Sequence, residues 1–238
     1  MKKQLLGVTI TMDSKEAILS EVKNYLFGKS KKSPFVIVTP NPEQIMLAQK
    51  NKDFLNMLNR ADVALPDGVG IVWAMKGSVA RITGIDFLSD LVRMANTNNW
   101  TVGLVGGKNS VAKKALAVFR SSYTHLQGWA IEPEETDEEK LTQHIANSNT
   151  KIVFVGLGAP KQEDYIDTVK KHCKQVVFMS VGGAFDMIAG TVPRAPEWIQ
   201  KIGCEWLYRL VREPRRWKRQ LALVKFIILV FFEKFFHP

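Results

Sequence analysis

Short runs of β-branched and aliphatic residues alternate with helical patterns along most of this 238-residue chain. Each run leads into a loop and then into apolar residues at helical spacing, and this unit recurs in five stretches: 35–50, 62–76, 101–119, 151–171 and 175–190. Strands that read as nearly continuous apolar runs belong to parallel sheets whose two faces are both covered by helices. The sequence therefore predicts an α/β fold with a parallel-sheet, Rossmann-like core.

The C-terminal part of the chain, 194–238, differs from this pattern. It holds ten of the lysines and arginines against four glutamates, so most of the net charge of +10 lies there. Arginines 209, 212, 216 and 219 recur at helical spacing beside apolar residues, which indicates an amphipathic helix. We therefore expect an α/β domain at 1–193 and a basic, helical appendage at 194–238. A helix pair that packs on the domain with its arginines solvated is the alternative.

The end of the chain is strongly apolar. The run from Leu221 to Phe232 is interrupted only by Lys225. As a helix it would be about 18 Å long, shorter than the ~30 Å hydrocarbon core of a bilayer. The sequence therefore predicts a tail that lies on a membrane surface, with a short tilted insertion as the alternative.

Several common kinds of site find no support in the sequence. The four histidines are scattered, Cys173 and Cys204 have neither metal-ligand nor disulfide-framework spacing, and no Asp-x-Asp occurs. The segment after Gly106 lacks the glycine spacing of a P-loop, and no complete GxGxxG is present. The N-terminus has no signal-peptide pattern. These features predict a protein of the reducing cytoplasm, with no metal site and no resident cofactor.

Ligands of open parallel sheets bind at the carboxyl ends of the strands, and the loops there carry unusual residues. Thr39 and Asn41 follow the first strand and suit the hydroxyl and acetamido groups of a sugar. The alternative, which this loop by itself favours, is a Pro-rich turn in which Asn41 makes an Asx-turn or caps the next helix. Asp67 follows the second strand and could serve as a general base or as a helix N-cap. Arg81 is a nearby cation whose alternative role is a surface salt bridge. Asp86 is expected to cap the helix that follows it.

Glycine turns follow three further strands, at Gly106-Gly107, at Gly156 and Gly158, and at Gly182-Gly183. Glycine lets the backbone approach a phosphate, and the next helix supplies oriented N–H groups. Tight strand-to-helix turns also use glycine, so one such turn is weak support, whereas three in one sheet favour a nucleotide or another diphosphate ligand. Gln162 and its charged neighbours suit a sugar or pyrophosphate, with a solvated first helical turn as the alternative.

Six motifs together resemble one protein family. In order along the chain they are TPNPE, PDGVG, RITGID, GLGAPKQE, VGGAFDMIAG and RAPEWIQKIGCEWLYRLVREPRR. Their combination is similar to the WecG/TagA/CpsF family (glycosyltransferase family 26) over nearly all of residues 5–220. The resemblance implies the α/β arrangement called GT-E, in a bacterial, membrane-associated enzyme of cell-surface polymer synthesis.

The resemblance also implies a reaction. An inverting transfer would move N-acetylmannosamine from a UDP-sugar to a polyprenyl-diphosphate-linked N-acetylglucosamine, as in teichoic-acid linkage synthesis. Transfer of N-acetylmannosamine uronic acid, or of another hexose for an antigen or capsule, is the alternative. The implied partners are the UDP-sugar, the lipid-linked acceptor and the inner face of the cytoplasmic membrane, with no nucleic acid. The oligomeric state, a homo-oligomer included, stays open.

Carried over by motif, the resemblance makes Asp67 the general base, with Arg81 and Gln162 as neighbouring active-site residues. Thr39 and Asn41 would line the acceptor-sugar pocket. The other substrate contacts that it implies are Trp129 against uracil, Gly158, Gly182, Gly183 and Asp186 toward the nucleotide, and Arg209, Arg216 and Arg219 at the diphosphate.

Two other classes of function compete with this interpretation. A non-catalytic nucleic-acid-binding protein would use the basic C-terminus for phosphate contacts. The aromatic and aliphatic run 226–236 argues against it, because a nucleic-acid-binding face does not need such an apolar segment. A membrane scaffold without turnover would not need the polar residues at the strand ends.

Overall fold

A computed structural model of the chain describes residues 1–28, 33–132, 138–212 and 217–236; within them, the side chains of 140, 218–220 and 234–236 are outside the description. Its centre is a six-stranded sheet in the order β4-β3-β8-β7-β5-β6. All neighbouring strands of this sheet pair in parallel. The strands are β3 (Phe35–Val38), β4 (Val63–Ala64), β5 (Thr101–Gly106), β6 (Gly128–Ile131), β7 (Thr150–Gly156) and β8 (Val177–Ser180).

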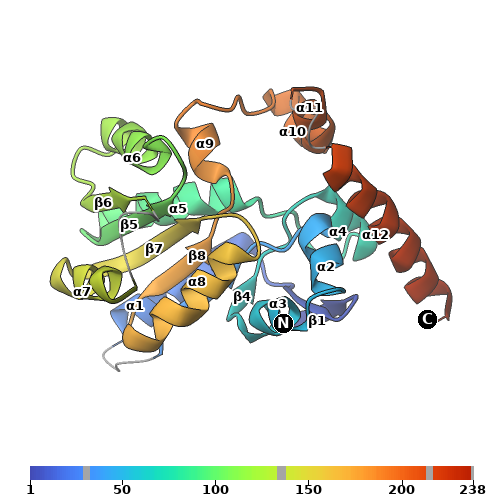
Figure 1. The fold of residues 1–238 in the computed structure, drawn as a ribbon, viewed down its shortest axis with the longest axis horizontal. Coiled ribbons are helices and arrows are strands. Elements are labelled where there is room, and N and C mark those ends of the chain that lie inside the picture. Colours follow the sequence, from blue (N-terminus) through green and yellow to red (C-terminus); the bar gives the residue numbers. More distant parts are fainter. Residues whose placement is uncertain (29–32, 133–137, 213–216, 237–238) are drawn as a thin grey trace.

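Helices cover both faces of this sheet (Figure 1). Side chains of β7 alternate between two apolar clusters, since Ile152 and Phe154 belong to one and Val153 and Val155 to the other. The first cluster includes residues of α1 (Lys15–Phe27), α5 (Gly84–Thr97), α6 (Val111–Ser122) and α9 (Ala184–Ile188). The second includes residues of α2 (Pro42–Ala48), α3 (Lys52–Arg60), α4 (Val69–Ala74), α7 (Glu138–Asn147) and α8 (Lys161–Val169), which runs into the 3-10 turn η2 (Lys170–His172). The predicted parallel α/β fold is confirmed.

Two features of the fold were not anticipated from the sequence. The edge strand β6 is only partly buried along its length, so it lacks the continuous apolar run that marks the inner strands. The chain also begins with an antiparallel hairpin of β1 (Lys2–Leu5) and β2 (Val8–Thr11). Leu6 and Gly7 join its strands with φ angles of 47° and 76°. Positive φ at both turn residues matches the right-handed twist of the flanking strands.

Two helices begin with capping contacts at residues that the sequence singled out. Asn41 is the N-cap of α2, where its Oδ1 accepts from the Gln44 N–H at 3.0 Å, so the capping alternative for Asn41 describes its actual contact. For α5 the prediction was wrong by three residues. Thr83, not Asp86, is the N-cap, and Asp86 lies in the first turn, where its carboxylate accepts from the Thr83 hydroxyl. Thr83 Oγ1 also accepts from the Asp86 N–H at 3.3 Å, which is one of the two contacts of a capping box, with Asp86 in the third helical position.

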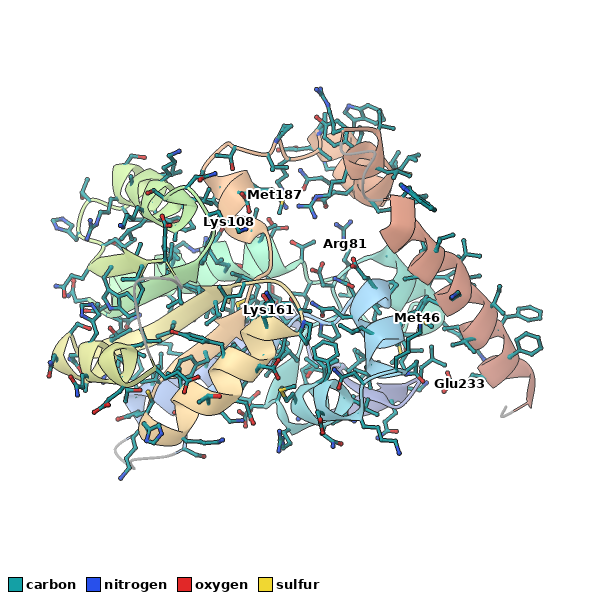
Figure 2. All side chains as sticks on the ribbon, viewed as in Figure 1. Met46, Arg81, Lys108, Lys161, Met187 and Glu233 are labelled. Carbon is teal, nitrogen blue, oxygen red and sulfur yellow. The ribbon has the colours of Figure 1, made fainter. Side chains whose placement is uncertain are left out.

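The C-terminal helices are α10 (Glu197–Lys201), α11 (Glu205–Arg212) and α12 (Trp217–Phe236). Helix α12 packs against α2 and α4 and fully buries Phe226 and Val230 in the second apolar cluster. Its Glu233 carboxylate accepts from the Leu6 N–H at 3.3 Å, so the helix reaches the N-terminal hairpin (Figures 1 and 2). Within the described residues, no helix is long and apolar enough to cross a membrane. The division at residue 194 stays a prediction.

Candidate active site at the carboxyl ends of the strands

The order of the strands in the sheet indicates where a ligand site would lie. From β3 the chain moves outward to β4 at one edge, and from β5 it moves outward to β6 at the other, so the strand order reverses between them. Such a reversal opens a crevice at the carboxyl ends of the central strands. Polar contacts tie these ends together, because the Thr39 hydroxyl after β3 donates to the Ser180 carbonyl of β8 at 3.3 Å. Arg81 and Met187 lie on the side of the sheet that α10 and α11 face (Figure 2).

Asp67 lies between β4 and α4 and does not cap the helix. The N-cap position belongs to Gly68, whose φ of 96° is a conformation that suits glycine, and no side chain of the described residues caps this turn. The Asp67 carboxylate is therefore available for another role. It lies beside Gly84, where an added Cβ would be 3.6 Å from Asp67 Oδ2 and 3.1 Å from Thr39 Cγ2. Thr39, Asp67 and the start of α5 thus meet at one point.

The surroundings of Asp67 make it a stronger base than an ordinary carboxylate. Burial, as the largest cause, and the negative charge of Glu205 raise the pKa of Asp67, whereas Arg81, the Gly84 backbone N–H and Arg209 lower it, and the net result is a pKa of about 6. Above pH 6 the carboxylate is mostly ionised and still binds a proton far more strongly than an exposed aspartate does. A pKa close to neutral pH is what a general base needs.

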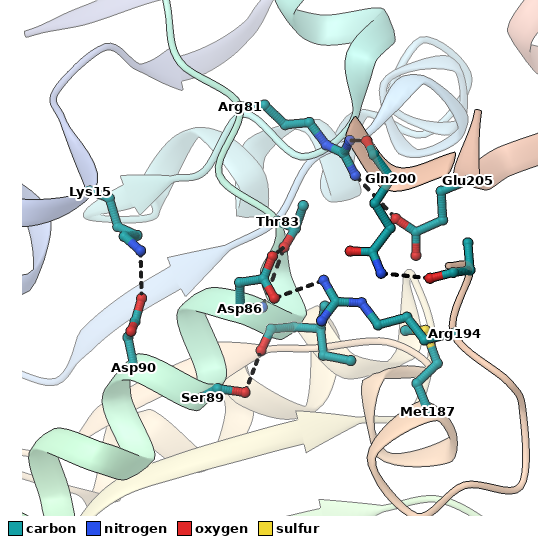
Figure 3. A network of polar contacts seen from close by, with 12 residues as sticks. Lys15, Arg81, Thr83, Asp86, Ser89, Asp90, Met187, Arg194, Gln200 and Glu205 are labelled. Carbon is teal, nitrogen blue, oxygen red and sulfur yellow. Dashed lines mark hydrogen bonds and ion pairs between the residues drawn. The ribbon is translucent and has the colours of Figure 1, made fainter. Parts of the chain in front are cut away.

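Arg81 connects the site with the C-terminal helices. Its Nη1 donates to the Gln200 carbonyl at 2.9 Å, and its Nη2 forms a 3.1 Å ion pair with Glu205 (Figure 3). Arg194 reaches back from the start of this region and pairs with Asp86 at 2.7 Å. The charge of Arg81 acts on Asp67, while its terminal nitrogens bind α10 and α11.

Gln162 is fully buried and joins two strand-end loops. Its Oε1 accepts from the Gly182 N–H at 3.0 Å, and its Nε2 donates to Glu163 Oε1 at 2.8 Å. Burial raises the pKa of Glu163 to about 7, although its contacts with Gln162, its own backbone and the Ser180 hydroxyl act in the opposite direction. Gln162 thus holds the Gly182-Gly183 turn through the Gly182 N–H. Its role as an active-site residue stays a prediction.

The predicted nucleotide-side residues lie along the same edge. Gly158 and Gly182 have φ angles of 75° and 52°, and an added Cβ at either position would meet no atom of the described part of the chain within 4 Å. Both turns therefore present an open backbone surface at the strand ends. Gly183 is the N-cap of α9, and Asp186 in the first turn of α9 accepts from the Thr191 hydroxyl through its carbonyl at 2.9 Å and through Oδ1 at 3.3 Å.

Trp129 lies apart from these residues, in the edge strand β6. Its ring covers Gly103, where an added Cβ would be 2.3 Å from Trp129 Cζ2. Its Nε1 donates to Thr150 Oγ1 at 2.8 Å, and the ring meets His144 edge-on with centroids 4.7 Å apart. These contacts account for the position of the indole by packing within the domain, and a contact with uracil stays a prediction.

The three arginines predicted at the diphosphate differ in what the structure describes. Arg209 of α11 reaches α9, where its Nη2 contacts Met187 Sδ at 2.6 Å, and its charge acts on Asp67. Arg216 lies outside the described residues. Arg219 belongs to α12, but its side chain is outside the description. Sequence reasoning missed the buried Glu163 as a separate feature, and it missed Glu205 altogether.

A cavity of about 660 Å³ opens beside the site, between the first turns of α1 and α5 and helix α10. Both basic and acidic side chains line it, among them Lys15, Arg81, Asp86, Arg194 and Glu197. No group of His, Cys, Asp and Glu side chains that could hold a metal ion occurs among the described residues. A parallel sheet whose strand ends carry a carboxylate of raised pKa, open glycine turns and arginines is typical of a ligand-binding α/β enzyme.

Comparison with known proteins narrows this class. Residues 3–238 match the family described as "Glycosyl transferase WecG/TagA/CpsF family". The chain is also 34% identical over 213 residues to the N-acetylglucosaminyldiphosphoundecaprenol N-acetyl-beta-D-mannosaminyltransferase of Bacillus subtilis (strain 168), a match that covers 85% of this chain and 83% of that protein. The chain therefore belongs to the WecG/TagA/CpsF family of glycosyltransferases, as the motifs predicted.

Proposed function

We propose that this protein transfers N-acetylmannosamine, with inversion, from a UDP-sugar to N-acetylglucosamine linked to a polyprenyl diphosphate. The observation that carries the proposal is the partly buried Asp67 carboxylate, whose pKa of about 6 suits a general base at neutral pH. The similar Bacillus subtilis protein is named for transfer of an N-acetyl-β-D-mannosaminyl group to N-acetylglucosaminyldiphosphoundecaprenol, which supports the choice of sugar and lipid.

In the proposed reaction, the acceptor hydroxyl of N-acetylglucosamine attacks the anomeric carbon of the donor sugar. The bond between that carbon and the UDP oxygen breaks as the new glycosidic bond forms, and Asp67 takes the hydroxyl proton. UDP leaves with the bonding electrons, so no covalent enzyme intermediate is needed. The single displacement inverts the anomeric centre, which gives a β product from an α-linked donor.

The departing diphosphate needs positive charge, because negative charge grows on its bridging oxygen as the bond breaks. Arg209 already lies within the electrostatic range of Asp67, and guanidinium groups bind phosphate oxygens in a bidentate manner. We assign Arg209, together with Arg216 and Arg219 of the same basic segment, to this task. The open backbone at Gly158 and Gly182 would receive the nucleotide side.

We place the reaction at the cytoplasmic face of the cell membrane, with 194–238 as the membrane-associating appendage. Large apolar side chains are exposed on all three C-terminal helices, while Phe226 and Val230 bind α12 to the domain. The exposed set includes Trp198, Ile202, Trp206, Leu207, Val211, Trp217, Leu221, Val224, Ile227, Ile228, Leu229, Phe231 and Phe232. Together with the local excess of basic residues, this surface fits the interface of an anionic bilayer.

Two experiments test the proposal. In the first, the full chain in detergent is given UDP-N-acetylmannosamine, its uronic acid or other UDP-hexoses with one N-acetylglucosaminyl-diphospholipid, and the lipid product is identified by mass spectrometry. We expect addition of N-acetylmannosamine and release of UDP. If the protein turned over none of these donors, the proposed activity would be refuted.

The second experiment measures cosedimentation with anionic vesicles. The Ile227→Glu, Ile228→Glu double variant should bind weakly, while Val118→Glu, at an exposed apolar position on α6, should bind like the unmodified protein.

A further inference from the structure

Glu205 stands out among the charged residues outside the predicted site. It begins α11, its side chain is mostly buried, and its partner is the guanidinium of Arg81, which lies 124 positions earlier in the chain. The same guanidinium holds the Gln200 carbonyl of α10 (Figure 3). Arg81 therefore binds both of the helices that carry the appendage over the strand ends.

These contacts fall on the short segment that borders the proposed base. Arg81, Thr83 and Gly84 are close together in the sequence. Gly84 lies beside the Asp67 carboxylate, since an added Cβ at Gly84 would be 3.6 Å from Asp67 Oδ2. A second contact strengthens the attachment, because Arg194 pairs with Asp86 in the first turn of α5. The turn between α10 and α11 rests on α4, since an added Cβ at Gly203 would be 2.4 Å from Val69 Cγ1. Docking of α10 and α11 and the surroundings of Asp67 are thus one structural unit.

We propose that Glu205 is a positioning residue: through Arg81 it docks α10 and α11 on the loop beside Asp67, and it keeps the Arg81 guanidinium from acting fully on the Asp67 carboxylate. The inference rests on the proposed role of Asp67. In the docked protein Arg81 divides its charge between two carboxylates. When α11 leaves, Glu205 and Arg209 leave with it; because Arg209 has the smallest of the three charge effects on Asp67, the released Arg81 can turn to Asp67 and weaken it as a base. Docking of the appendage would in this way prepare the base.

The electrostatics of Asp67 agree with this geometry. Among the described residues, the charged side chains that act on the carboxyl are Arg81, Glu205 and Arg209. Glu205 raises the pKa of Asp67, and the two arginines lower it. Loss of the Glu205 charge while α11 stays docked should therefore lower the pKa of Asp67. If Glu205 only held the helix in place, a substitution that keeps its hydrogen bond with Arg81 would leave the pKa of Asp67 unchanged.

The test separates the two effects of Glu205 with two substitutions. Glu205→Gln keeps an oxygen that can accept from Arg81 but removes the charge, whereas Glu205→Ala removes both. Glu197→Gln is the matched control, because Glu197 is an exposed glutamate on α10 beside the same cavity. Hydrogen exchange of the α10 and α11 amides measures docking in the full chain in detergent. Carbon-13 NMR of labelled aspartate, assigned with Asp67→Asn, measures the pKa of Asp67 without any substrate.

We expect Glu205→Ala to speed exchange in α10 and α11 by roughly 10- to 100-fold, the equivalent of one charge-assisted hydrogen bond. Glu205→Gln should leave exchange nearly unchanged and move the Asp67 titration, and with it the acidic limb of kcat/KM, to lower pH. Glu197→Gln should change neither. Unchanged exchange in Glu205→Ala, or an unchanged Asp67 titration in Glu205→Gln, would overturn the inference. A protein that transfers no sugar but shows both effects would refute the proposed function and leave the docking role in place.

Discussion

Replacing Asp67 by asparagine should stabilise the protein while it removes the proposed base. Burial raises the pKa of Asp67 from 3.8 to about 6. Between these values the folded protein keeps a proton that the unfolded chain releases, so stability falls as the pH rises through this window and stays level above it. The difference corresponds to about 3 kcal/mol, at about 1.4 kcal/mol for each pH unit. Asparagine cannot ionise, and Asp67→Asn should therefore recover most of this free energy at pH 7.5.

Thermal unfolding in one detergent at pH 7.5 and at pH 4 measures the effect. For a chain of this size, about 3 kcal/mol corresponds to a rise in Tm of roughly 6–12 °C at pH 7.5, with little change at pH 4. Asp164→Asn is the control, because this exposed aspartate lies in the first turn of α8 and its loss should cost less than about 1 kcal/mol. If Asp67→Asn were less stable than the unmodified protein at pH 7.5, or equally stable at both pH values, the electrostatic account of the site would be wrong.

Two further substitutions test the surroundings of the site. Burial raises the pKa of Glu163 from 4.5 to about 7, and a glutamine at this position could still accept from Gln162. Glu163→Gln should therefore raise the free energy of unfolding by about 3 kcal/mol at pH 8 and leave it unchanged at pH 4. Denaturant titrations at both pH values measure this, and a variant no more stable than the unmodified protein at pH 8 would contradict the assigned burial. Phe226→Ala should lower the free energy of unfolding by about 3–5 kcal/mol and speed hydrogen exchange throughout α12, because it removes a fully buried side chain. Ile227→Ala, at a position 44% exposed, should do neither. Similar exchange in both variants would mean that α12 is not held by its buried face.

The sequence was sufficient to predict the sheet because the inner strands are buried on both faces. Runs such as Phe35–Val38 and 177–179 consist of residues that are all buried, and this produces a signal in which apolar residues follow one another without a break. The edge strand β6 gave no such signal, because one side of an edge strand has no neighbouring strand to bury it. The start of α5 was misplaced because Thr83 and Asp86 both suit a helix N-terminus, and only their mutual contact decides which one caps.

The candidate site was predicted as a set of loops rather than as a set of contacts. The rule that ligands bind at the carboxyl ends of parallel strands brought Thr39, Asp67 and Gln162 to one edge, and the structure places them there. No local pattern could reveal that Arg81 pairs with Glu205, because the two residues are far apart in the chain and meet only when α11 docks. Burial of Glu163 was equally hidden, since a charged residue in a first helical turn is usually solvated.

The central claim is that Asp67 is the general base of glycosyl transfer, and the pH dependence of kcat/KM tests it most directly. The full chain in detergent is assayed with UDP-N-acetylmannosamine and an N-acetylglucosaminyl-diphospholipid, and binding of UDP to each variant is measured by calorimetry. We expect an acidic limb near pH 6, and in Asp67→Asn a loss of roughly 100- to 10,000-fold in kcat with UDP affinity retained. A variant that keeps its activity, or an acidic limb that persists unchanged in the residual activity of Asp67→Asn, would contradict the claim.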